Sequence, residues 1–100
     1  MFQIDNLVIK QPKEWDKKWR FITFDIPEKR KIVREALRGK LKQLGFSPFQ
    51  KSIWIYPYSC TAEIELLKDF FGLVDREIQL IVAENIGQDD NWKRAFRLSC

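Results

Sequence analysis

The clearest pattern of apolar positions in the chain is WRFITFDI, residues 19–26, which predicts a β-strand. Its side chains are apolar or β-branched on both faces, and a strand of that kind is usually covered on both sides. Alternation assigns Ile22, Phe24 and Ile26 to one face and Trp19, Phe21 and Thr23 to the other. Helices of the same chain can cover one face, so we expect terminal segments or a second subunit to cover the other.

A helix is predicted next, beginning with Pro27 and Glu28 and running to about Leu44. Apolar residues recur in it at spacings of three and four, which is the pattern of a helix with one buried face. Gly45 follows the last apolar position and is a typical stop signal. The predicted buried stripe consists of Ile32, Val33, Ala36, Leu37, Leu41 and Leu44.

The rest of the chain predicts two short strands, at 46–50 and 52–57, then a helix at 62–71 and a strand at 77–83. Lys51 alone separates the two short strands, so we expect a tight or bulged hairpin. After these elements we expect a turn and a short helix or arm. The buried face of the second helix is predicted to hold Ile64, Leu67, Phe70 and Phe71.

The order of elements is strand, helix, strand, strand, helix, strand, which is typical of an α+β ferredoxin-like fold (βαββαβ). That fold is a four-stranded antiparallel sheet with both helices on one face. One hundred residues suit a single domain, whose core we place at about 19–86 with terminal arms at 1–18 and 87–100.

The sheet face opposite the helices is predicted to carry aromatic side chains, namely Phe21 and alternating members of Phe49 and 53–56. An open face this apolar usually indicates dimerisation. We therefore expect a homodimer joined through the open sheet face and the edge strands. The terminal segments are expected to be fastened over the sheet by Trp15, Trp19 and Trp92.

The chain contains no histidine and two cysteines, Cys60 and Cys100. The lack of imidazole excludes histidine-based acid–base chemistry and triads, and two cysteines alone cannot supply the usual four zinc ligands. A metal would have to be a hard cation bound by oxygen atoms. No apolar run approaches the ~20 residues that cross a bilayer, and the N-terminus lacks a signal-peptide layout, so we expect a cytoplasmic protein with no membrane contact.

The formal net charge is +4, and its distribution is uneven. Residues 29–42 contain many lysines and arginines but a single acid, Glu35. A basic helix on a basic domain is typical of polyanion binders, although a solvated helix face has the same composition. In the first interpretation, contacts with a nucleic-acid backbone, independent of base sequence, would come from Lys29, Arg30, Lys31, Arg34, Arg38 and Lys42.

Four stretches together resemble a known family: FDIP at the strand end, the helix RKIVREALRGKLKQLGF, the segment FQKSIWIYPY and the closing IQLIVAENI. They are similar to the Cas-two family of CRISPR adaptation proteins and equally to the related central domain of PaaX-type transcriptional regulators. FDIPE, LGF and SIWIYPY are closest to the PaaX-like branch. The resemblance covers roughly residues 15–86 and implies a ferredoxin-like homodimer.

Each branch of the resemblance implies a function. In the CRISPR branch, the dimer bridges pairs of integrase subunits and helps to hold DNA, and nuclease activity varies between members. In the PaaX branch, the domain lies between a winged-helix DNA-binding domain and a C-terminal region. If the 100 residues are a whole protein, the adaptation protein is favoured, because 100 residues leave no room for a winged-helix domain as well. If they are an excised domain, the regulator is favoured.

We therefore expect an architectural DNA-binding subunit of CRISPR spacer acquisition, with metal-dependent endonuclease activity that is weak or absent. The alternative is the dimerisation domain of a PaaX-like repressor, without catalysis.

Asp25 lies at the junction of the first predicted strand and the first predicted helix, and the sequence allows two roles for it. With Glu28 it forms DIPE, a capping-box pattern in which an acid replaces Ser or Thr, and such a cap contributes about 1 kcal/mol. The resemblance implies instead that Asp25 matches an acid proposed to hold a divalent metal between subunits. Two such carboxylates at a two-fold axis would repel each other unless Mg²⁺ or a shared proton lay between them. Asp25 is thus the candidate catalytic and metal-binding residue.

Overall fold

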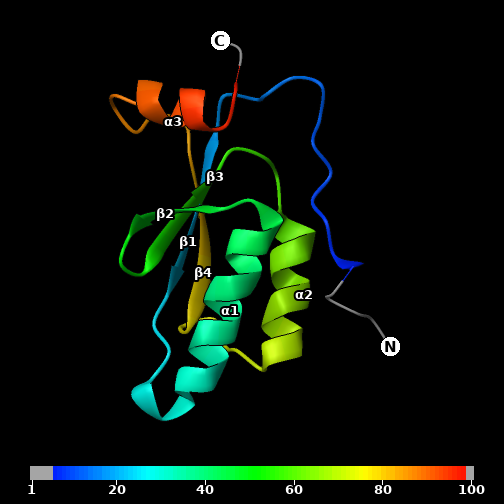
Figure 1. Ribbon diagram of the computed structural model, residues 1–100, viewed down its shortest axis with the longest axis vertical. Helices are drawn as coiled ribbons and strands as arrows, with labels where there is room; N and C mark the ends of the chain where they lie inside the picture. Colours follow the sequence, from blue (N-terminus) through cyan, green and yellow to red (C-terminus); the bar gives the residue numbers. More distant parts are fainter. Residues whose placement is uncertain (1–5, 99–100) are drawn as a thin grey trace.

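The computed structural model describes residues 6–98 and contains a four-stranded antiparallel sheet (Figure 1). The strands are β1 (Trp19–Phe24), β2 (Ser47–Gln50), β3 (Ile53–Tyr56) and β4 (Ile78–Ala83), in the spatial order β2-β3-β1-β4. Two helices, α1 (Lys31–Leu44) and α2 (Thr61–Phe71), lie side by side and cover one face of the sheet (Figure 1). The predicted ferredoxin-like α+β fold is confirmed.

The junction between β1 and α1 differs from the prediction. The strand ends at Phe24 rather than Ile26, and a 3₁₀ turn, η2 (Glu28–Arg30), precedes α1. Arg30 has φ −112° and ψ 35°, which is not helical, so one continuous helix from Pro27 does not form. Residues 25–27 are needed to lead the chain out of the sheet, and Pro27 cannot donate a backbone hydrogen bond there.

The core lies between the sheet and the two helices. Ile22 and Phe24 of β1 point into it, and the cross-strand partner of Ile22 on β3, Trp54, lies on the same side. α1 adds Leu37 and Leu41, both fully buried. The predicted assignment of the faces of the first strand is therefore confirmed.

The buried faces of the helices are narrower than predicted. Ile32 is 86% exposed and Ala36 is also exposed, because both lie to one side of the Leu37–Leu41 row, whereas Lys40 is buried beside it. On α2, Phe70 is 51% exposed. Periodicity thus located the buried side of each helix but overestimated its width.

The opposite face of the sheet is covered at one end. A third helix, α3 (Asp90–Ala95), follows β4 and places Trp92 against Phe49, with ring centroids 5.6 Å apart. Trp15 packs on Trp19 at 4.8 Å. Trp19 and Ile55 are fully buried there, outside the main core cluster. The prediction that tryptophans fasten the terminal segments over the sheet is confirmed.

The same face is open over its remaining area. Phe21 pairs in register with Ile55 on one side and Ile81 on the other. Ile81 is 47% exposed and Phe49 is 37% exposed. Among the described residues, no helix has the length and apolar character needed to span a bilayer.

Candidate functional site

A hollow of about 260 Å³ opens where β1 ends, beside the first half of α1 and the turn between β2 and β3. We call it the strand-end cleft. The Phe24 N–H donates to the carbonyl of Ser52 (3.2 Å), which brings the β2–β3 turn next to Asp25. The cleft therefore brings together some, but not all, of the predicted site residues. It is lined by Phe24, Asp25, Ile26, Glu28, Arg34, Arg38, Lys51 and Ser52.

The side chain of Asp25 is exposed and caps neither helical segment. Pro27 is the N-cap of η2 and Arg30 that of α1, and neither start has a side-chain cap hydrogen bond. Glu28, the predicted capping partner, forms an ion pair with Arg34 instead (3.2 Å). The predicted capping box is wrong, because the helical segments begin too far along the chain for Asp25 to reach their first N–H groups.

The lining of the strand-end cleft can be compared with the needs of Mg²⁺, which is held by carboxylates and water in octahedral geometry. Asp25 and Glu28 supply carboxylates, and that of Glu28 is paired with Arg34. Arg38 and Lys51 add positive charge to the same lining. Within residues 6–98, no group of three or more acidic or cysteine side chains is placed to hold a metal. The lining that one chain supplies fits an anion such as phosphate better than Mg²⁺, because the cations would repel a second cation.

Arg30 lies away from the cleft and braces α1 against α2 and the start of β4. Its Nη1 donates to both carboxylate oxygens of Glu77 (3.2 and 3.1 Å), and its Nη2 donates to the carbonyls of Phe71 (3.0 Å) and Gly72 (3.4 Å). A hydrogen bond from the Val74 N–H, together with the charge of Arg30, holds the pKa of Glu77 below its usual value. The guanidinium of Arg30 is therefore occupied within the fold.

The other predicted nucleic-acid-binding residues of α1 divide into two sets. Arg34 contacts Glu28 and Glu35, at 3.2 and 3.5 Å, and lines the cleft. Arg38 lines both the cleft and a neighbouring hollow of about 500 Å³, which Lys42 also lines. The cleft and this hollow therefore share Arg38, and both linings mix cations with acids, because Glu35 also lines the hollow.

Lys29 and Lys31 are exposed and lie outside the lining of the cleft. Sequence reasoning missed Lys51, which joins Arg34 and Arg38 from the β2–β3 turn. Lys51 could have been found from the predicted fold, because the ferredoxin-like strand order places the β3 end of this hairpin beside β1. The contact between Arg30 and Glu77, 47 positions apart, has no such local signal.

Cys60 is buried in the core next to the start of α2. Burial raises the pKa of its thiol to about 12. A thiol that stays protonated is a poor nucleophile, so Cys60 acts here as a small apolar residue.

A family model described as the PaaX protein central Cas2-like domain matches residues 12–95. No curated protein and no solved structure matches the chain. The family match spans the whole sheet, both core helices and the strand-end cleft. The chain therefore belongs to the family of the PaaX protein central Cas2-like domain.

Proposed function

We propose that this chain is a homodimerisation domain that acts in a PaaX-type transcriptional regulator and has no catalytic role of its own. The observation that carries the proposal is the apolar area left open on the sheet face, around Phe21, Ile53 and Ile81. The family match to the central domain of PaaX proteins supports it.

The open face suits a second copy of the same chain. Phe21 contacts Phe49 edge to face at 5.1 Å, and Ile81 lies on the neighbouring strand. These side chains form an apolar surface that crosses the strands, and a two-fold axis would place the same surface of the partner against it. Burying Ile81 and Phe49, now 47% and 37% exposed, would extend the small second core that Trp19 and Ile55 begin.

The two edges of the sheet also differ in their ability to pair. The β2 edge contains Pro48 and a register shift between Pro48 and Gln50, and both features block pairing with another strand. The β4 edge is six residues long, and Ile81 and Val82 are about half exposed along it. The proposed dimer therefore uses the sheet face and the β4 edge rather than the β2 edge.

Sedimentation of the whole chain at micromolar concentration tests the dimer. We expect the native chain to sediment as a dimer and Ile81→Asp as a folded monomer, because an aspartate would be buried without a partner in the interface. Ile32→Asp is the matched control, since Ile32 is more exposed than Ile81 and lies on α1. A native chain that remains monomeric, or equal dissociation of both variants, would refute the proposal.

A second candidate function is favoured by the strand-end cleft. Its three cations, Arg34, Arg38 and Lys51, suit contacts with DNA phosphates, as an architectural subunit of CRISPR spacer acquisition would need. In that function Asp25 of each copy would lie near the dimer axis. In that case duplex DNA should bind, and binding should weaken steeply as salt rises from about 50 to about 200 mM. Arg38→Gln and Lys51→Gln should each weaken binding, whereas Lys10→Gln should not, because Lys10 lies outside the cleft lining.

DNA-binding measurements distinguish the two candidate functions. Salt-sensitive DNA binding that depends on Arg38 and Lys51 selects the adaptation subunit, and a dimer without such binding selects the regulator domain. The surrounding reading frames give an independent test. A winged-helix segment in frame upstream supports the regulator, and a neighbouring integrase gene with a repeat array supports the adaptation subunit.

A further inference from the structure

Phe49 links the open sheet face to the C-terminal helix α3. It lies on β2, a four-residue edge strand whose register with β3 shifts between Pro48 and Gln50. A short edge strand with a disrupted ladder is held by few backbone hydrogen bonds, so neighbouring side chains must fix the Phe49 ring. That ring contacts Phe21 at 5.1 Å and Trp92 of α3 at 5.6 Å. Phe49 is therefore shared between the proposed dimer surface and α3.

α3 lies at one end of the sheet (Figure 1) and is held there by Trp19 and Asp89. The indole Nε1–H of Trp19 donates to Oδ2 of Asp89 (2.9 Å), the residue just before α3. Trp19 is fully buried, and a buried donor is costly to leave without an acceptor. The ring of Phe96, directly after α3, packs on Trp19 at 6.0 Å. We call the hydrogen bond between Trp19 and Asp89 the α3 latch.

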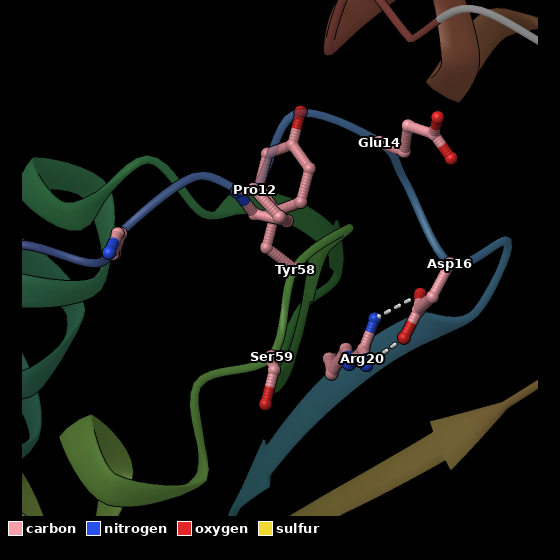
Figure 2. A pocket seen from close by; sticks show the side chains of 7 residues that line it. Pro12, Glu14, Asp16, Arg20, Tyr58 and Ser59 are labelled. Atoms are coloured by element: carbon pink, nitrogen blue, oxygen red, sulfur yellow. Dashed lines mark hydrogen bonds and ion pairs between the residues drawn. The ribbon is translucent and has the colours of Figure 1, made fainter.

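The N-terminal segment contacts the same end of the sheet. Figure 2 shows Asp16 turned toward Arg20, which donates to both of its carboxylate oxygens (2.8 and 2.6 Å). The preceding residue, Trp15, packs on Trp19 at 4.8 Å, and Nζ of Lys93 in α3 lies 6.0 Å from the centre of the Trp15 ring. α3 is therefore docked against side chains that the fold itself holds in place.

These contacts let α3 act on the open face. When α3 is docked, Trp92 restricts the ring of Phe49, which is still 37% exposed and can meet a partner. When α3 is released, Phe49 regains rotamer freedom, and association would have to remove that freedom again. Residues 84–89 join β4 to α3 and include Gly87, whose left-handed φ of 84° suits a hinge.

We propose that α3 is a switch for dimerisation: when docked it positions Phe49 for a second copy of the chain, and when released it weakens the dimer. This inference rests on the proposed dimer and assigns the element that regulates it. A binding partner that pulled α3 away from its latch would dissociate the dimer without touching the open face. Because coupling between two equilibria is reciprocal, dimerisation must in turn hold α3 more firmly.

Variants of the whole chain test the coupling by sedimentation. Trp92→Ala removes the contact with Phe49 and should raise the dimer dissociation constant at least about tenfold. Asp89→Ala removes the acceptor of the latch and should raise it at least about fivefold. Asp89→Asn keeps an oxygen that accepts from Trp19 and should stay within about twofold of the native chain. Phe70→Ala, which shortens an aromatic side chain on α2, is the matched control and should leave the dissociation constant unchanged.

Hydrogen exchange tests the reciprocal effect with α3 itself unaltered. The amides of Lys93 and Phe96 donate within α3, to the carbonyls of Asp89 (2.9 Å) and Trp92 (3.0 Å). We expect both amides to exchange at least about threefold more slowly in the native dimer than in monomeric Ile81→Asp. The amide of Ile64, in α2, is the reference and should slow less. This comparison decides the question even if a variant at the latch does not fold.

The possible failures are distinguishable. A native chain that stays monomeric refutes the proposed dimer, and the switch with it. A native dimer that Trp92→Ala weakens no more than Phe70→Ala does, or that leaves the exchange of α3 unslowed, overturns the switch alone. Equal weakening by Asp89→Asn and Asp89→Ala would show that the hydrogen bond to Trp19 is not the latch, and this would also overturn the inference.

Discussion

The two ends of β1 both carry charged residues, and they are built in opposite ways. At the first end, Arg20 is 6% exposed, and its guanidinium binds Asp16 and two backbone carbonyls. At the other end, Asp25 is exposed, and it is the backbone N–H of Asp25 that is held in place, by the carbonyl of Glu77 (2.9 Å).

This difference separates residues that hold the fold from residues that are free to bind. A buried charge is tolerated only when its hydrogen bonds are made, so the partners of Arg20 contribute to stability. An exposed carboxylate costs little to solvate, so Asp25 contributes little to stability and its side chain remains available. The cations near the start of α1 are not free in this sense, since Arg30 is engaged with Glu77 and the end of α2, and Arg34 forms ion pairs with Glu28 and Glu35.

The largest effect is expected from Asp16→Ala, which leaves the guanidinium of Arg20 buried without its carboxylate. We expect the free energy of unfolding to fall by about 2–3 kcal/mol, measured by urea denaturation. Asp75→Ala is the matched control, because Asp75 is 91% exposed and its pair with Lys68 is at the surface, where the loss should stay below about 0.5 kcal/mol. Equal losses in the two variants would contradict the contrast between the ends of β1.

A smaller loss of folding stability is expected when the pH is lowered. The pKa of Asp16 is lowered mainly by its hydrogen bond from Arg20, and the pKa of Glu77 mainly by the Val74 N–H. Both carboxyls bind protons less readily in the folded chain, so their contribution is complete above their ordinary pKa values and is lost as the pH falls through the lowered ones. The urea midpoint of unfolding should therefore drop between neutral pH and about pH 3. In Asp16→Asn the midpoint should change less steeply with pH than in the native chain. An unchanged slope in Asp16→Asn would show that Asp16 does not carry the effect.

Much of the fold could be predicted because it depends on local patterns. Alternation along β1 separated Ile22 and Phe24 from Phe21, and Gly45 marked the end of α1, where it adopts a left-handed φ of 108°. The width of the buried helix faces could not be predicted, because periodicity does not say how closely a neighbouring element approaches. Ile32 shows this, since it continues the apolar pattern of α1 and is still 86% exposed.

The candidate site could be predicted only in part. Asp25, Arg34 and Arg38 meet in one cleft because a strand end and a helix start are joined by a short link. The contact of Arg30 with Glu77 and that of Arg20 with Pro57 join positions far apart in the sequence. By composition, Arg30 is one of many cations in this stretch. Only the packing of α2 and β4 around it determines that its guanidinium is hydrogen-bonded within the fold and not free to bind a ligand.

The smallest effect is expected from Asp25→Ala. A carboxylate that capped the helix would cost about 1 kcal/mol on removal. Since Asp25 caps neither η2 nor α1, its loss should change the free energy of unfolding by less than about 0.5 kcal/mol in the same urea measurement. Glu28→Ala should behave alike, because the Glu28 side chain is 77% exposed in its ion pair with Arg34. A loss near 1 kcal/mol in Asp25→Ala alone would show that Asp25 does act as a helix cap. If sedimentation also shows tighter association of Asp25→Ala than of the native chain, the result would support two Asp25 carboxylates that repel each other across the dimer axis, since removing a charge that faces only solvent would leave association unchanged.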